Sequence, residues 1–294
     1  MMHVRGRYQD AAELIEQELA LHAEAKHLQS LVLPLRVRLV HHKMFYRPVS
    51  ELYPEMFDLL ARCDTEEDAG SYREILFMLG GNLGTLKGEY DGARRFLIRA
   101  IRCAEQHKDR YLLARCLRKY GDYLRHRGHL HFSNAVLTEA LNLSVGDQGS
   151  RQRIYILGCL GDLERQKLNY SASREYFETV LELAKAAYIP GWLGNLHLGL
   201  AEIAIERNAL DEARALLDQA EAHYRKTRPK HWWGEIQVGL GRCRVVRLAG
   251  EPSWVEVAQT TQREAVGAGY DADATFASKL LEGDLHSRHV LMFL

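Results

Sequence analysis

Three histidines near the middle of the chain come closest to the spacing of a chemical site. His126, His129 and His131 form an H-x-x-H-x-H cluster, and three imidazole nitrogens are a common ligand set for zinc. No cysteine or carboxylate completes the set, and the cluster spans the corner between two expected helices. We therefore interpret it as a polar turn and predict no metal site.

The chain also lacks the short motifs that accompany catalysis. The G-x-S-x-G turn, the P-loop, the H-E-x-x-H pair and a G-x-G-x-x-G loop after a strand are all absent. The segment LGGNLGTLKGEY is rich in glycine and holds a lysine, but it does not have P-loop spacing. We predict no enzymatic activity and no cofactor, and an enzyme with an unrecognised site is the least favoured alternative.

The charge balance restricts the class of partner. Lysine plus arginine number 39, aspartate plus glutamate number 39, and the formal net charge is zero. Nucleic-acid binding depends on an excess of cations, so nucleic acid is not the expected partner. No run of about 18 apolar residues occurs, so we predict no membrane span.

Five cysteines occur without a C-x-x-C pair or another disulfide or zinc framework. We interpret them as reduced, mostly buried residues of a cytoplasmic protein. The first residues also lack the apolar core of a secretion signal.

A repeat of 40 residues runs through most of the chain. Small residues recur at that interval, and further small and apolar columns follow 12 and 16 residues later. Because glycine disfavours a helix interior, such a column indicates close approach of two helices, so each unit is predicted to hold two packed amphipathic helices. The columns are Gly81, Gly121, Gly161, Ala201 and Gly241; Ala93, Ser133, Ser173, Ala213 and Ser253; and Leu97, Leu137, Phe177, Leu217 and Val257.

The turn within each unit is periodic as well. Gly88, Gly128, Asn169 and Asn208 stand where the first helix should end. Glycine and asparagine tolerate the left-handed conformation of a helix C-cap, so we predict that these four residues adopt it.

GEYDGARRFLIRA, LGDLERQKLNYSASREYF and LGLAEIAIERNALDEARALL resemble the tetratricopeptide repeat family, in a long 40-residue variant found in sensor and scaffold arrays. The resemblance implies an all-α, right-handed superhelical solenoid of antiparallel helix pairs, with about seven units. We expect a single solenoid over 1–294: degenerate units at 1–70, five regular units at 71–267, and a C-terminal helix with an apolar tail at 268–294.

In this family, partners bind the concave face of the first helices. The resemblance therefore predicts a non-enzymatic scaffold or sensor that binds a protein or peptide, or alternatively the regulatory portion of a larger signal-transduction ATPase or transcription regulator. The predicted binding residues are Asn82, Arg115, Arg118, Asp122, Arg125, Tyr155, Asp162, Arg165, Asn195 and Glu202. Within this set, Asp122 and Arg125, and likewise Asp162 and Arg165, are oppositely charged pairs at i,i+3 spacing. Each pair could instead satisfy its own charges on a solvated face.

Two further parts of the chain are candidate interaction surfaces. Trp192 and Trp232 lie 40 residues apart, and they either cover the seam between units or form a second binding edge. The tail His289–Leu294 is apolar, so we also predict self-association through one end of the solenoid.

Overall fold

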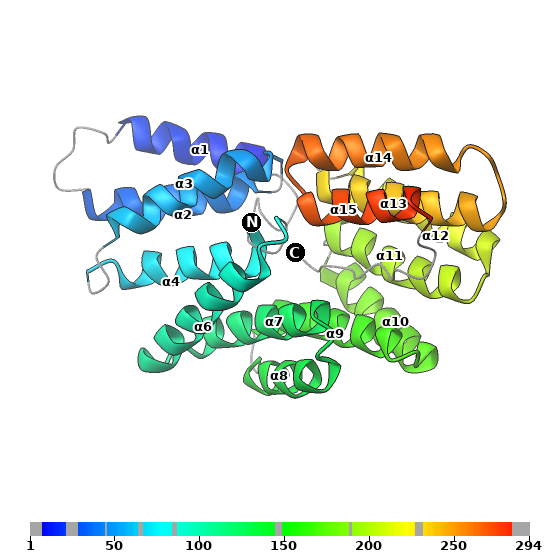
Figure 1. The fold of residues 1–294 in the computed structure, drawn as a ribbon. Coiled ribbons are helices and arrows are strands. Elements are labelled where there is room, and N and C mark those ends of the chain that lie inside the picture. The colour runs from blue at the N-terminus through cyan, green and yellow to red at the C-terminus, as the bar shows by residue number, and fades with distance from the viewer. Residues whose placement is uncertain are drawn as a thin grey trace.

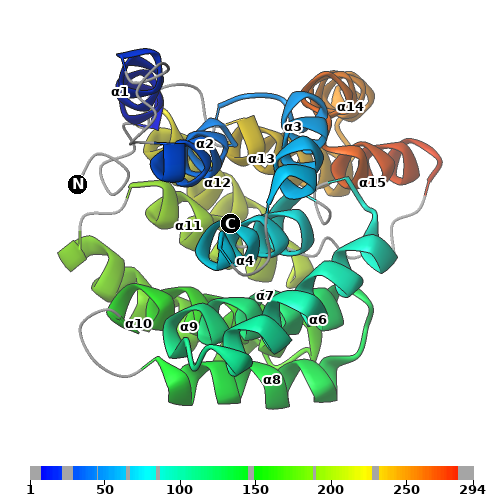
Figure 2. The ribbon, with the colours of Figure 1, turned by 90° about the vertical axis from the view of Figure 1, so that its left-hand side faces the viewer.

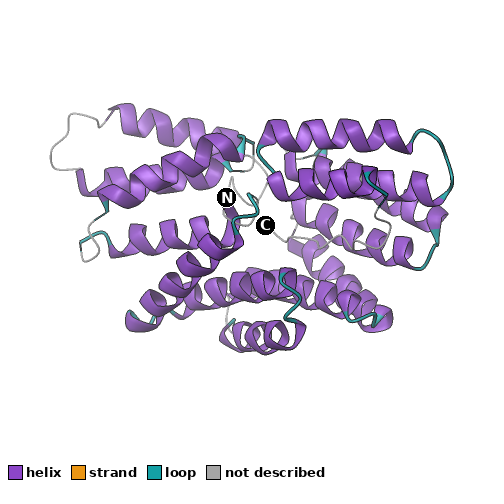
Figure 3. Ribbon diagram, viewed as in Figure 1, coloured by secondary structure: helices purple, strands orange, loops and turns teal. Residues whose placement is uncertain are grey.

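The computed structural model describes residues 8–21, 29–44, 46–63, 67–83, 87–144, 149–187, 190–226 and 232–283. Within these ranges the regular secondary structure is entirely helical (Figure 3), which confirms the all-α prediction. None of the described helices is long and apolar enough to cross a membrane. The elements are α1 (Tyr8–Leu21), α2 (Gln29–Lys43), α3 (Val49–Arg62), α4 (Ala69–Met78), the π-helix η3 (Leu79–Leu83), α6 (Tyr90–Gln106), α7 (Arg110–His126), α8 (Leu130–Leu143), α9 (Gly149–Gln166), α10 (Tyr170–Ala187), α11 (Pro190–Glu206), α12 (Leu210–Tyr224), α13 (Trp232–Leu248), α14 (Trp254–Ala268) and α15 (Asp271–Leu281).

The helices form two layers. Consecutive helices pack on one another, and α7, α9, α11, α13 and α15 also contact each other in turn, which makes them an inner layer. At the N-terminal side α2 contacts α4 in the same manner. This packing of neighbouring helices is consistent with a helical repeat.

The array curls until its two ends meet. Figures 1 and 2 both place α3 close to α14 and α15. The turn before α6 contacts the start of α15: Lys87 Nζ lies 3.5 Å from Asp271 Oδ2, and a Cβ on Gly88 would lie 3.8 Å from the Ala272 Cβ. One ion pair therefore joins segments about 180 residues apart, at a point where the backbones of Gly88 and Ala272 also lie close together.

The small-residue column marks close contacts between helices, as predicted. Gly121 lies in α7 and Gly161 in α9. A Cβ at Gly121 would lie 2.7 Å from the Leu137 side chain, and one at Gly161 would lie 2.8 Å from the Phe177 ring. The Ser133 hydroxyl donates to the Gly121 carbonyl oxygen at 2.8 Å, so a side chain of α8 reaches the backbone of α7 at this contact.

The first regular unit departs from the column. Gly80, rather than Gly81, faces the second helix: its Cβ would lie 2.8 Å from backbone atoms of Ala93 and Leu97. Gly81 instead faces the Lys119 side chain of α7. Because the π-helix η3 widens the turn at this point, the contact is displaced by one residue.

The predicted turn residues need one correction. Gly88, Gly128 and Asn208 have positive φ, but in the third unit Leu168 has φ 66° in place of Asn169. Asn169 instead accepts a weak hydrogen bond from the Ala172 backbone N–H at 3.5 Å, at the start of α10. The residue with positive φ therefore recurs at intervals of 40, whichever residue type stands there. Asn169, one residue after Leu168, serves as the N-cap of α10 instead.

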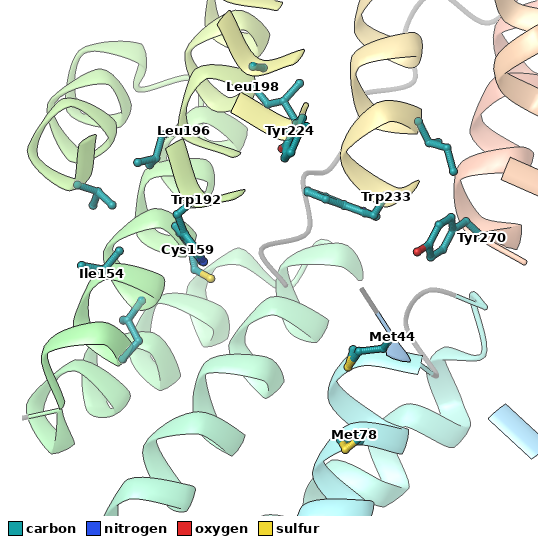
Figure 4. Packing of buried hydrophobic residues seen from close by; sticks show 14 of the residues in the cluster. Met44, Met78, Ile154, Cys159, Trp192, Leu196, Leu198, Tyr224, Trp233 and Tyr270 are labelled. Carbon is teal, nitrogen blue, oxygen red and sulfur yellow. The ribbon is translucent and has the colours of Figure 1, made fainter. Parts of the chain in front are cut away.

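One hydrophobic cluster extends from α2 to α15, and Figure 4 shows Trp192, Tyr224, Trp233 and Tyr270 among its larger members. Trp192 is buried, with its ring centroid 4.2 Å from that of Tyr155 on α9. Trp192 therefore covers the seam between two units. The side chain of Trp232, and the tail at 289–294 on which the self-association prediction depends, lie outside the described residues.

Gly161→Ala should lower the free energy of unfolding by about 1–3 kcal/mol, because the new methyl group meets the Phe177 ring. Gly267→Ala in α14 is the matched control. Its Cβ would meet nothing within 4 Å, so it should leave stability unchanged or raise it by up to about 1 kcal/mol. Denaturant titration measures both, and equal effects would show that the column does not mark a tight contact.

Candidate functional site

Most of the predicted binding residues are buried instead of lining an open groove. Seven of them expose 4% or less of their surface. They face neighbouring helices of the inner layer, and a helical wheel cannot distinguish such a seam from a solvated face. The side chain of Asn82 lies outside the described residues. The seven are Arg118, Asp122, Arg125, Asp162, Arg165, Asn195 and Glu202.

A chain of ion pairs runs through the seam between α7 and α9. Arg125 Nη2 lies 2.5 Å from Asp122 Oδ1, and the same guanidinium pairs with Asp162 on α9. Arg165 Nε lies 2.6 Å from the other oxygen of Asp162. Both i,i+3 pairs predicted from the sequence therefore form, but in the interior and not on a solvated face.

The chain continues into the next two units. Arg165 also pairs with Glu206 on α11, and Arg244 of α13 pairs with Glu202 of α11. We call these seven residues, Asp122, Arg125, Asp162, Arg165, Glu202, Glu206 and Arg244, the ion-pair ladder. A charge reversal here would place like charges against buried carboxylates, so we expect it to destabilise the fold.

The carboxylates of the ladder are kept ionised by the arginines that pair with them. Burial acts to raise the pKa of Asp122, but the surrounding cations, with Arg125 foremost among them, together outweigh burial and hold that pKa below its ordinary value. Asn195 is similarly engaged, because its Oδ1 accepts a hydrogen bond of 2.6 Å from the Tyr224 hydroxyl. These predicted residues have structural partners within the chain.

The remaining two predicted residues, Arg115 and Tyr155, meet at a cavity together with Arg118, one of the buried seven. Arg115 and Arg118 on α7 and Tyr155 on α9 line a space of about 630 Å³ whose remaining walls come from α2, residues 67–68 and α4. The Arg118 guanidinium lies over the Tyr155 ring at 5.2 Å. This cavity is the candidate functional site.

A fixed ion pair forms one wall of the cavity. Arg115 donates from its two terminal nitrogens to the two Glu74 carboxylate oxygens at 2.8 and 2.7 Å, and it covers the Phe77 ring at 4.2 Å. Burial acts to raise the pKa of Glu74, but Arg115 lowers it further than that. His41 Nδ1 lies 3.6 Å from Glu74, and burial lowers the pKa of His41 to about 4, so the ring is neutral at pH 7.

Ser71, His41 and Glu74 all line the cavity, and together they are the residue types of a hydrolytic triad. Their geometry does not form one. Both Glu74 oxygens are held by Arg115, the 3.6 Å separation from His41 exceeds a hydrogen bond, and among the described residues Ser71 makes no side-chain hydrogen bond. A neutral ring with a pKa near 4 is also a weak general base at pH 7.

Sequence reasoning missed several cavity residues, among them Arg38, Arg151 and Gln152. A signal existed in the repeat. Ser71, Tyr111 and Arg151 are spaced by 40 residues, and all three line the cavity. The column is hard to recognise because its members share no chemical type.

The histidines give no metal site in the described part of the chain. No group of three or more potential ligands occurs there, and the His126, His129 and His131 turn is included in that part. A different pair stacks inside the fold: the ring of the buried His197 lies 5.2 Å from that of the half-buried His223, with 8° between their planes. Burial, and then His223, lower the pKa of His197 to about 4.

Arg165→Leu should lower the free energy of unfolding by about 3–5 kcal/mol, because it leaves buried carboxylates without their cation. The control is Arg214→Leu, whose pair with Glu251 is more than 40% exposed on both sides. Its cost should be below about 1 kcal/mol. Chemical denaturation compares the two, and similar losses would contradict a stabilising role for the ladder.

His197 should make the fold sensitive to mild acid. Its folded pKa of about 4 lies below the ordinary value of 6.5, so the unfolded chain binds more protons between these values, and stability falls as pH is lowered through that window. Between pH 7 and pH 5 this group should contribute a loss of about 2 kcal/mol or less.

His197→Phe should therefore flatten the pH dependence of the unfolding free energy between pH 7 and pH 5. The exposed residue His129 provides the control His129→Phe, which should keep the wild-type slope. If His197→Phe also keeps that slope, the buried imidazole does not govern it.

Comparison with models of known protein families and with curated protein sequences finds no match to this chain. The functional interpretation therefore depends on the cavity, the ion-pair ladder and the repeat themselves.

Proposed function

We propose that the chain is a binding module of the tetratricopeptide type, which takes a segment of a partner protein in the cavity between α2, α4, α7 and α9. One observation carries the proposal: a half-open space of about 630 Å³ lined by helices of the inner layer. Ligand sites typically measure roughly 300–1,000 Å³. In helical repeat arrays the inner face is the surface that receives partners.

The lining suits a peptide. Tyr111 is 42% exposed and Tyr155 half-buried, which provides aromatic contact area, while the arginines provide directional donors. The Arg115–Glu74 pair is fixed before any ligand arrives, so binding need not order it. Ser71, His41 and Glu74 are not arranged as a hydrolytic triad, which supports binding over hydrolysis.

The setting of this module is a reducing compartment, which we propose to be the cytoplasm. None of the five cysteines, all of which lie in the described residues, forms a disulfide, as is usual where thiols are kept reduced. The balanced charge of the chain favours a protein partner over nucleic acid.

A peptide-display experiment tests the proposal. A random peptide library panned on the chain should enrich a shared motif, and synthetic peptides carrying it should bind in fluorescence anisotropy. Gly70 lines the cavity, and a Cβ there meets nothing within 4 Å. The first side-chain atom of Gly70→Trp therefore enters open space, and the bulk of this side chain in the cavity should weaken binding by about tenfold or more.

Gly92→Trp is the matched control. Gly92 lies in α6 with open space at its Cβ, and it does not line the cavity, so this variant should bind as the wild type does. Failure to enrich any motif, or equal binding by the Gly70 and Gly92 variants, would contradict the proposed site.

A further inference from the structure

Two arginines in the cavity wall form no ion pair with a described carboxylate, although the charge of Arg38 helps to lower the pKa of Glu74. Arg38 lies on α2 and is exposed, and Arg151 lies in the first turn of α9 and is half-buried. Within the described residues neither has an ion pair or a hydrogen bond. Arg115, by contrast, is neutralised by both oxygens of Glu74.

Among the described residues that line the cavity, the charge count is also positive. The lining holds four arginines, Arg38, Arg115, Arg118 and Arg151, and three carboxylates, Glu67, Asp68 and Glu74, which leaves an excess of one positive charge. His41 adds no charge near pH 7, because burial holds its pKa at about 4. The two carboxylates before α4 reduce the excess, while Arg38 and Arg151 hold it on α2 and α9.

Three helices begin at this cavity. The first-turn residues Gly70 of α4, Tyr111 of α7 and Arg151 of α9 all line it, and these helices contain 10, 17 and 18 residues. The N-terminal end of a helix carries partial positive charge from its free N–H groups. The field of the backbone therefore has the same sign as the unpaired arginines.

Gln152 supplies an independent indication of a ligand. It lines the cavity beside Arg151 and is only 4% exposed, yet its Oε1 has no hydrogen-bond partner in the described part of the chain. Buried polar atoms are nearly always paired, and exceptions call for an explanation. This oxygen is itself shielded from solvent, so a donor from a bound molecule, such as a peptide N–H, would satisfy it once the Gln152 side chain turns toward the cavity.

We propose that Arg38 and Arg151 hold an oxyanion on a side chain of the bound peptide, an acidic or a phosphorylated residue, while a neighbouring peptide N–H donates to Gln152 Oε1. The inference rests on the proposed function for its peptide, but the anion site is testable separately. Arginine donates in a planar fork that matches carboxylate and phosphate oxygens. One anion between two such forks would balance the charge left open by the chain.

The first test uses hexapeptide pools that are N-acetylated and C-amidated, so that no terminal charge contributes. The third residue is fixed as Asp, Glu, phosphoserine, Ser, Gln or Lys, and the other positions are mixed. The acidic or phosphoserine pools should bind about tenfold tighter than the Ser and Gln pools, as expected for hydrogen bonds to a charged group. Comparing acidic with phosphoserine pools identifies the source of the oxyanion.

The variant pair is Arg38→Gln with Arg151→Gln, which should remove the preference for the anion. The matched control is Arg36→Gln with Arg153→Gln, on the same two helices. Both control arginines are exposed and neither lines the cavity, so the preference should be kept. Equal binding of all pools to the wild type, or a preference that survives in the Arg38 and Arg151 variant, overturns the inference.

The second test needs no peptide. The Nε–Hε resonance of Arg151, identified by its loss in Arg151→Gln, is followed while sodium phosphate or sodium acetate is added at constant ionic strength. It should move in the wild type and in the Arg36 and Arg153 control, and not in Arg38→Gln.

If no pool binds but this resonance moves, the anion site stands and the proposed peptide function fails. If pools bind without preference and the resonance is still, the peptide function stands and the inference fails. Absence of both effects removes both.

Discussion

The contact between small residues within each unit is the constraint on which the rest of this structure depends. At Gly121 there is no room for a Cβ, and the carbonyl oxygen of that glycine accepts a hydrogen bond from Ser133 on the next helix. Two helices that touch at backbone distance form a stiff pair. Such pairs stack through their first helices, so α7, α9, α11 and α13 meet in turn, and the seams between them define the interior.

Those seams are polar, which sets this array apart from a purely apolar stack. Asp162 accepts from both Arg125 and Arg165, so one carboxylate joins two arginines and two helices. Burying such charges adds little net stability compared with apolar packing, but removing one partner is costly. A guanidinium group also requires its carboxylate acceptor at a definite position along the axis of the facing helix. We infer that the ladder fixes the register of successive units, which an apolar seam would specify less strictly.

The parts of this fold that the sequence predicts are those where sterics admit few residue types. Gly121 and Gly161 were recognisable because only a small residue fits at a backbone contact, and that requirement repeats every 40 positions. Burial of Asp162 was not predictable, since a carboxylate on a helix face looks the same whether it meets water or an arginine of another unit. Arg151 escaped notice because its column contains Ser71 and Tyr111, so the position repeats while the chemistry does not.

The cavity occurs where the repeat is least regular, and this association has a physical basis. A regular array brings each first helix against the next and fills the space between them, so a ligand-sized space requires a local departure from the pattern. Here α4 passes into a π-helix, which moves the close contact from Gly81 to Gly80, and α2 contains Pro34, which disturbs its backbone hydrogen bonding. Such departures cost stability, and proteins concentrate them at functional sites. The irregular seam beside α2 and α4, with its unpaired arginines, is therefore where recognition is best supported, while the regular units from α7 to α13 hold it in shape.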